Sequence, residues 1–82
     1  MPLNKVEKSY IKKLGKNIVS VRKEKGLLQK ELADILDMAD SSLRRIEHGL
    51  TNPTTSTLFN IADALNVSVS VLFDFPFKSD DK

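Results

Sequence analysis

The sequence of 82 residues contains no cysteine, and only three glycines and three prolines. Without cysteine the chain can form neither a disulfide nor a thiolate metal site, and this composition suits the reducing cytosol. No apolar run approaches the roughly 18 residues that a membrane-spanning helix needs. Residues 1–9 also lack the apolar stretch of a signal peptide. We therefore expect a soluble, cytoplasmic protein.

The residue patterns that catalysis requires are missing as well. The sequence shows no nucleophile accompanied by a base and an orienting group, no glycine-rich phosphate loop and no cluster of metal ligands. His48 is the only histidine, and it lies at the end of a predicted helix, where positive charge is favourable. We expect no enzymatic activity, no cofactor and no bound metal.

Basic residues are concentrated in the first part of the chain. Residues 1–49 hold 11 Lys or Arg against 7 Asp or Glu, whereas residues 50–82 hold 2 against 4. This asymmetry indicates a surface with one side that faces a polyanion. Lysine-rich helices also serve solubility alone, so the charge does not decide the function. The length permits one domain with a modest core.

Apolar residues at helical spacing predict a first helix from about Ser9, a suitable N-cap, to about Lys25. Gly26 would end it. Its buried stripe consists of Ile11, Leu14, Ile18 and Val21. Its first half carries the lysines Lys5, Lys8, Lys12, Lys13 and Lys16.

Caps, apolar spacing and helix terminators predict four further helices, over residues 29–36, 40–48, 55–65 and 69–73. Thr54 and Ser68 cap the last two, and Asn66 can adopt the left-handed conformation that ends the fourth. The predicted fold class is therefore all-α with five helices. A short strand remains an alternative for the alternating residues Val67, Val69 and Val71.

Residues 29–49 are the most informative stretch, because they predict two short helices joined by a tight turn. The second helix carries Arg44 and Arg45 on its outer side, and the small Ala33 lets the two helices pass closely. This is the spacing of a helix-turn-helix, whose second helix enters the major groove of DNA. An ordinary pair of core helices is the alternative.

Several motifs accompany this turn, namely Arg22, Gly26, Gln29, Leu32-Ala33, Ile46-Glu47-His48-Gly49, Asn52-Pro53 and the stretch from Ile61 to Ser68. Through them the chain resembles the DNA-binding domain of the phage Cro and lambda repressor family, the XRE-type helix-turn-helix. The resemblance covers about Leu14 to Phe73 and implies a compact, five-helix, lambda-repressor-like domain at residues 9–74. Residues 1–8 would form an N-terminal arm, and residues 75–82 a C-terminal tail that is dimer-contacting or disordered.

The resemblance also implies a structural salt bridge between Arg22 and Glu47, which ties the first helix to the end of the recognition helix. Both residues lie among apolar neighbours, where an unpaired charge is costly. The chain departs from the family pattern at the turn, where Asp37 replaces the usual glycine. It also departs at the caps Leu28 and Ala39, which lack a side-chain acceptor.

By resemblance, bases would be read by four residues of the recognition helix, Asp40, Ser41, Arg44 and Arg45. Arg45 is the strongest candidate, because a guanidinium can pair with guanine O6 and N7. Arg44 would meet phosphate or share the base contact. Asp40 could accept from a cytosine amine, or it could be a solvated acid that repels phosphate.

Phosphates would be bound near helix starts, where free backbone N–H groups and the helix dipole favour an anion. By resemblance, Gln29 is the best candidate for this role. Its plausible neighbours are Lys30, Asn52, Thr54 and Thr55. Lys30 can equally be an ordinary surface lysine.

Val71 falls where a solvated side chain is expected, and three phenylalanines follow it. In small regulators of this family, the fifth helix and the residues after it form the two-fold interface. The resemblance therefore implies dimer contacts at Val69, Val71, Phe73, Phe75 and Phe77. The alternative is a tail that folds back over its own core. A homodimer would place two recognition helices about 34 Å apart on a pseudo-palindromic operator of double-stranded DNA.

The expected function is that of a small, stand-alone transcriptional regulator, such as a Cro-like repressor or a restriction–modification controller. Two other functions stay open. The chain could be an antitoxin or another protein-interaction module with a small protein partner, which the aromatic tail and Asp40 would suit. It could also be a bridging coactivator that does not read bases, although the paired arginines disfavour that.

Overall fold

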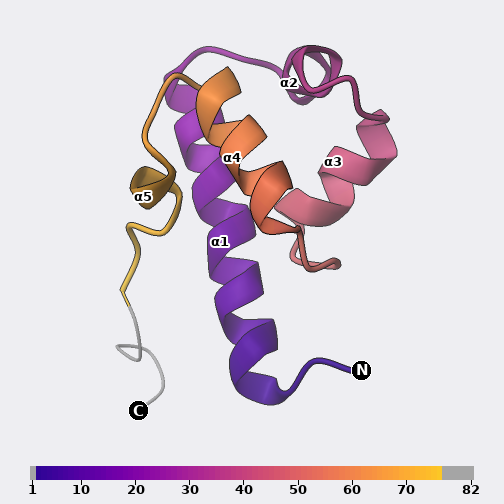
Figure 1. The fold of residues 1–82 in the computed structure, drawn as a ribbon, viewed down its shortest axis with the longest axis vertical. Coiled ribbons are helices and arrows are strands. Elements are labelled where there is room, and N and C mark those ends of the chain that lie inside the picture. The colour runs from indigo at the N-terminus through magenta and orange to yellow at the C-terminus, as the bar shows by residue number, and fades with distance from the viewer. Residues whose placement is uncertain (1, 77–82) are drawn as a thin grey trace.

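The computed structural model describes residues 2–76, which form five helices and no strand (Figure 1). The helices are α1 (Lys5–Glu24), α2 (Gln29–Ile35), α3 (Asp40–Glu47), α4 (Thr55–Ala64) and α5 (Val69–Leu72). The all-α prediction is confirmed, and the alternative of a strand is wrong because Val69 and Val71 lie in α5. No helix within these residues is long and apolar enough to cross a membrane.

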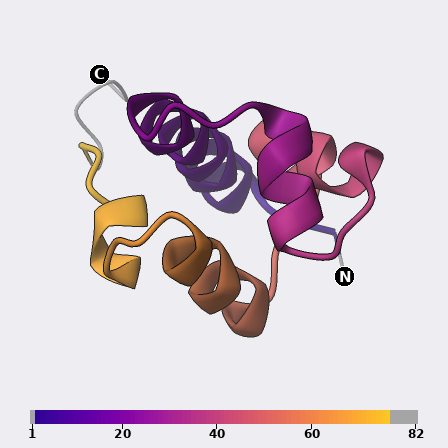
Figure 2. The same cartoon turned by 90° about the horizontal axis from the view of Figure 1, so that it is seen from above.

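The helices are arranged around a common centre, as the view from above shows (Figure 2), and their apolar sides form the core. Its most completely buried side chains come from every helix and are Ile18, Leu32, Leu43, Ile61, Leu65 and Leu72. Full burial of one such side chain contributes about 1.5–3 kcal/mol. Each of the five helices supplies at least one of these side chains, so packing in the core holds the helices together.

Helix α1 begins four residues earlier than the predicted cap at Ser9. Asn4 is the N-cap: its side chain accepts from the Glu7 N–H at 2.8 Å, and the Glu7 carboxylate accepts from the Asn4 N–H at 2.9 Å. This reciprocal pair satisfies two backbone donors that would otherwise lack partners. Residues 5–8, expected in an N-terminal arm, are therefore helical, and the start of α1 extends past the other helices (Figure 1).

The turn between α2 and α3 depends on a left-handed residue. Asp37 has φ of 54°, and the Met38 N–H donates to the Ala33 carbonyl at 3.0 Å. Aspartate tolerates this conformation better than most side chains, because its short polar group bonds locally. The departure from glycine is thus compatible with the tight turn that sets α3 against α2.

Helices α1 and α3 approach so closely at Gly15 that no side chain fits there. A Cβ at this position would lie 2.6 Å from the carbonyl oxygens of Ile46 and Glu47. Backbone carbonyls near the end of α3 cannot move without shifting the helix. Gly15 therefore sets the distance between the long helix and α3.

We expect Gly15→Ala to destabilise the protein by about 1–3 kcal/mol, because the added methyl group over-packs this contact. The loss should occur although alanine favours a helix over glycine by about 0.5–1 kcal/mol. Urea denaturation monitored by circular dichroism measures it. The control is Ser20→Ala at an exposed position of α1, which should leave stability nearly unchanged. A Gly15→Ala protein as stable as the parent would show that α1 and α3 are not in close contact.

Candidate nucleic-acid interface

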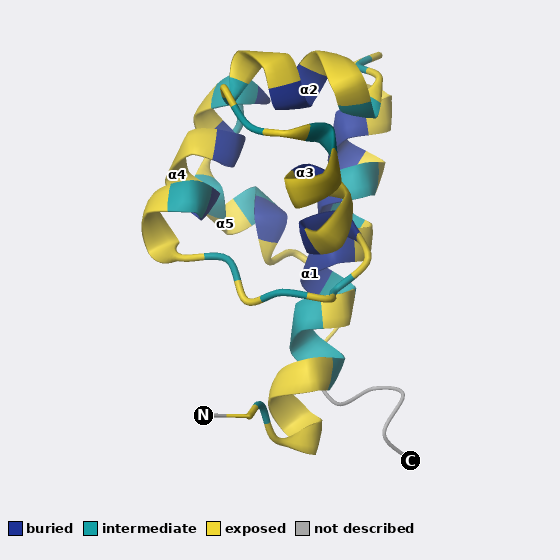
Figure 3. Ribbon diagram, turned by 90° about the vertical axis from the view of Figure 1, so that its right-hand side faces the viewer, coloured by how far each residue is buried: buried dark blue, intermediate teal, exposed yellow. Residues whose placement is uncertain are grey.

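The face of α3 that points away from the core is polar and exposed (Figure 3). Leu43, Ile46 and Glu47 are the buried residues of this helix. Of the four predicted base-reading residues, three are exposed and Asp40 is half-buried; the exposed ones are Ser41, Arg44 and Arg45. Within residues 2–76 neither guanidinium makes a hydrogen bond or an ion pair. Both are available to a ligand.

The two arginines of α3 point in different directions, because they are adjacent in the sequence. Successive residues are about 100° apart around a helix, so Ser41 and Arg45 share the line that points most directly away from the core. Arg44 lies on the flank nearer to Glu47, and Ser42 on the flank nearer to Ile46. Arg45 is therefore placed at the centre of the exposed surface and Arg44 at its side.

A buried ion pair fixes the end of α3 to α1. The Arg22 Nε donates to Glu47 Oε2 at 2.8 Å and its Nη2 donates to Oε1 at 3.2 Å. The Arg22 Nη1 donates to the Leu27 carbonyl at 2.9 Å. The side chains are 9% and 2% exposed, so the pair is shielded from water. The two groups that the resemblance paired thus lie in contact and hold α3 in its orientation.

The side chain of Gln29 is turned toward the buried ion pair, whereas a residue that only binds phosphate would extend into solvent. Its Nε2 donates to Glu47 Oε1 at 2.8 Å, so it joins the buried pair from the start of α2. The amide nitrogen carries a second hydrogen, and the backbone N–H of Gln29 lies in the first turn of α2. The second amide hydrogen and the backbone N–H are therefore the groups with which Gln29 can bind an anion.

A pocket of about 260 Å³ lies beside α3 and collects predicted residues from two segments. Arg45 lines it together with Asn52 and Thr54, and Ser42 lines it as well. The Thr54 hydroxyl accepts from the Thr57 N–H at 3.1 Å and so caps α4. The remaining predicted residues, Thr55 and Lys30, are exposed but do not line this pocket.

The predicted dimer residues divide into two groups. Val69, Val71 and Phe75 are partly buried and pack against the core of their own chain, whereas Phe73 is 40% exposed. Phe77 lies outside the described residues. Up to Pro76 the tail contacts its own chain through Phe75, which packs against the core.

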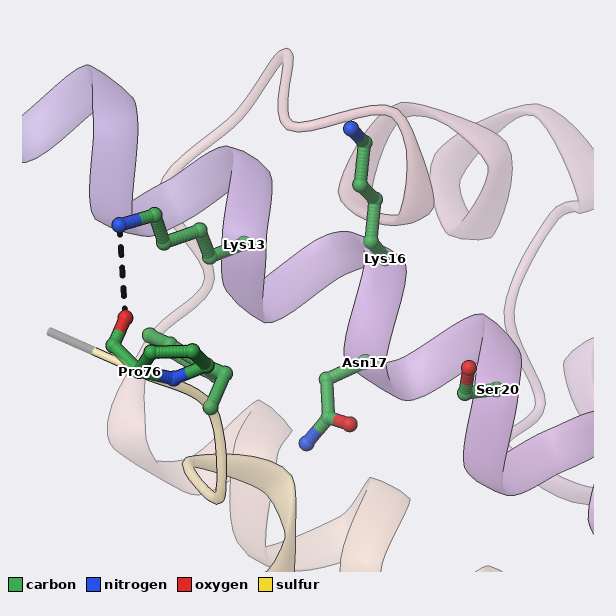
Figure 4. Close-up of a pocket in the computed structure, with 6 residues that line it drawn as sticks. Lys13, Lys16, Asn17, Ser20 and Pro76 are labelled. Atoms are coloured by element: carbon green, nitrogen blue, oxygen red, sulfur yellow. Dashed lines mark hydrogen bonds between the residues drawn. The ribbon is translucent and has the colours of Figure 1, made fainter. Parts of the chain in front are cut away.

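Asn17 of α1 holds α5 in this arrangement. Its Nδ2 lies 2.8 Å from the carbonyl oxygens of both Val71 and Leu72, which are among the last residues of α5. The Lys13 Nζ lies 3.4 Å from the Pro76 carbonyl oxygen, a longer contact further along the tail (Figure 4). Asn17 thus satisfies carbonyls that a helix end leaves free.

Three features of this region were not predicted from the sequence, namely the bond between Gln29 and Glu47, the bonds of Asn17 to α5 and the position of Ser42 beside Arg45. The bond between Gln29 and Glu47 joins residues 18 apart, and the bonds of Asn17 reach α5 over more than 50 residues. No local pattern signals either contact. Ser42 had a signal, because it precedes Arg45 by three residues and so lies on the same side of a helix.

The chain is similar in sequence to known helix-turn-helix proteins. A helix-turn-helix family model matches residues 18–72. The match begins after the first half of α1, so residues 5–17 precede it. The 10 kDa protein of the ImmF control region of Bacillus phage phi105 is 46% identical over 61 residues, which are 74% of this chain and 68% of the relative.

Solved structures agree with this match. The restriction-modification controller protein C.AhdI from Aeromonas hydrophila superposes with a TM-score of 0.77 at 28% identity, covering 79% of this chain and 98% of that one. The biofilm master regulator SinR, known from Bacillus subtilis and solved in complex with DNA, has a TM-score of 0.69 at 42% identity. That match covers 74% of this chain and 98% of the SinR chain.

Proposed function

Because this chain belongs to the helix-turn-helix family of DNA-binding transcriptional regulators, we propose that it binds a pseudo-palindromic operator as a homodimer with α3 in the major groove. The observation that carries the proposal is the exposed pair Arg44 and Arg45 on a helix anchored by the buried Glu47. A rigid helix that presents free guanidiniums suits the donor and acceptor pattern of base edges.

Within this proposal the four predicted base-reading residues have separate roles. Arg45 pairs with guanine O6 and N7 from the centre of the surface, and Ser41, one turn earlier, bonds a base or a phosphate. Arg44 binds a phosphate at the edge of the groove. Asp40 is half-buried at the start of α3, where it interacts favourably with the helix dipole and takes little part in reading bases.

Phosphates on either side of the groove are bound by the starts of α2 and α4. On one side Gln29 uses its free amide hydrogen and its backbone N–H, with Lys30 next to it. On the other side Asn52 contributes its side chain, while Thr54 and Thr55 contribute the start of α4. These contacts position the protein, whereas the base contacts give the sequence preference.

The homodimer contact is proposed at the C-terminal side of the domain. Among the described members of the predicted set, Phe73 is the exposed one, and it adjoins an apolar pocket of about 310 Å³. Tyr10, Pro53 and Leu58 also line this pocket. A two-fold contact there would set two α3 helices about one DNA turn apart. Occupancy of the operator would then rise with the protein's own concentration, because dimerisation and binding are linked.

The test is a mobility-shift assay against DNA from the region upstream of the protein's own reading frame, over about 50 to 200 mM salt. The affinity should fall steeply, since a protein with six to ten phosphate contacts loses roughly 10³- to 10⁵-fold over this range. A scrambled duplex of the same length and composition is the control. Equal affinity for both duplexes, or no binding to either, would contradict the proposal.

A second candidate function is that of a protein-interaction module, such as an antitoxin. The apolar pocket and Phe59, which is 54% exposed, favour this second function because such surfaces bind apolar partners. Size-exclusion chromatography of the protein from its native host distinguishes the two. A stable complex with a small protein, together with no preference for the upstream duplex, would favour the module.

A further inference from the structure

Three lysines on the first half of α1 form a basic row that the α3 contacts do not explain. Lys5, Lys8 and Lys12 recur at intervals of three and four residues, so they lie on one side of the helix. All three are exposed, and within residues 2–76 none of their ammonium groups makes a hydrogen bond or an ion pair. The acid in this segment, Glu7, points elsewhere and bonds the Asn4 N–H.

This lysine row begins beside the end of α3. A Cβ at Gly49, which follows α3, would lie 2.8 Å from both the Cα and the Cγ of Lys12. Gly15, one turn later in α1, packs against the α3 carbonyls. The row therefore runs from the end of α3 along the part of α1 that extends past the other helices (Figures 1 and 3).

We propose that the lysine row binds phosphates of the DNA backbone next to the groove that α3 occupies. The row spans about 10 Å, since an α-helix rises about 1.5 Å per residue. Over that axial length one strand of duplex DNA places about three phosphates. Residues 5–24, the whole of α1, hold seven Lys or Arg and two Glu, so the charge of the helix suits this ligand.

The inference rests on the proposed function and extends it to a segment that precedes the part of the chain matching the family. The capping pair of Asn4 and Glu7 gives it a structural basis, because it makes residues 5–8 a fixed helix. Lysines on a fixed helix lose less conformational freedom on binding than lysines on a flexible arm. Phosphate contacts carry no sequence information, so the row should add affinity without changing base preference.

The test compares the parent protein with a variant carrying Lys5→Gln, Lys8→Gln and Lys12→Gln in the salt-dependent mobility-shift assay. Each lost phosphate contact lowers the slope of log K against log salt by about 0.9. For three lost contacts the slope should fall by about 2.7, and the affinity at 0.1 M salt should fall roughly 500-fold. The sequences selected from random DNA should stay the same.

A matched pair of single variants separates specific contacts from a general effect of charge. Lys12→Gln should lower the slope by about 0.9, whereas Lys13→Gln should leave it unchanged. Lys13 is the next residue but turns toward Pro76 and the tail (Figure 4). Thermal melting by circular dichroism should show that all variants are folded, because glutamine is a good helix former.

The outcomes assign any failure to one proposal or the other. If the parent protein shows no salt-dependent preference for the upstream duplex, the proposed function fails and the inference fails with it. If the parent binds the operator but the triple variant keeps its slope and affinity, only the inference is overturned. An equal effect of Lys12→Gln and Lys13→Gln would overturn it too, because the row would then act only as diffuse charge.

Discussion

Replacing Glu47 with alanine should destabilise the protein by about 3–5 kcal/mol, the usual cost of leaving one partner of a buried ion pair alone. The Arg22 guanidinium would keep its bond to the Leu27 carbonyl but lose both bonds to the carboxylate. Gln29 would lose its acceptor as well. Because a domain of this size is stable by only about 5–15 kcal/mol, much of its stability depends on this group.

Denaturant titration measures this loss, and two further variants test its cause. Glu31→Ala removes an exposed glutamate whose carboxylate, within residues 2–76, accepts only from the Leu28 N–H, so it should cost about 1 kcal/mol or less. Replacing the pair together, with Arg22→Met and Glu47→Leu, should recover most of the loss, because no unpaired charge remains. A loss below about 1 kcal/mol for Glu47→Ala would show that water reaches the pair.

Replacing Arg45 with alanine should relax the sequence preference at one position of each half-site. A bidentate contact with guanine contributes about 1–3 kcal/mol of discrimination, so the preference should fall about 5- to 150-fold. Selection of binding sites from random DNA, before and after the substitution, measures the effect. The stability of the fold should not change, because the side chain is exposed and unbonded within residues 2–76.

Arg44→Ala is the matched control, since it removes the neighbouring guanidinium from the flank of α3. It should weaken binding to all sequences alike and lower the salt slope by about 0.9, as expected for a phosphate contact. If Arg45→Ala instead weakened every sequence equally while Arg44→Ala changed the selected bases, the two roles would be reversed. If neither changed DNA binding, α3 would not be the reading helix.

Much of the local structure could be predicted because its causes lie within a few residues. The buried stripe of α1 follows from the spacing of Leu14, Ile18 and Val21, which matches the period of a helix. The left-handed conformation at Asn66 follows from a residue type that tolerates it. The apolar stripe favours a start of α1 at Ser9, which is wrong, because Asn4 and Glu7 form a capping pair one turn earlier.

The five helices, the tight turn and the outward position of Arg44 and Arg45 follow from the order of residues alone, because helical period and caps are local properties. The packing of the helices, in contrast, places Gln29 against Glu47, Asn17 against the end of α5 and Gly15 against α3. Those contacts join residues from different helices. Their geometry depends on how the helices pack against one another, which no period along the chain encodes.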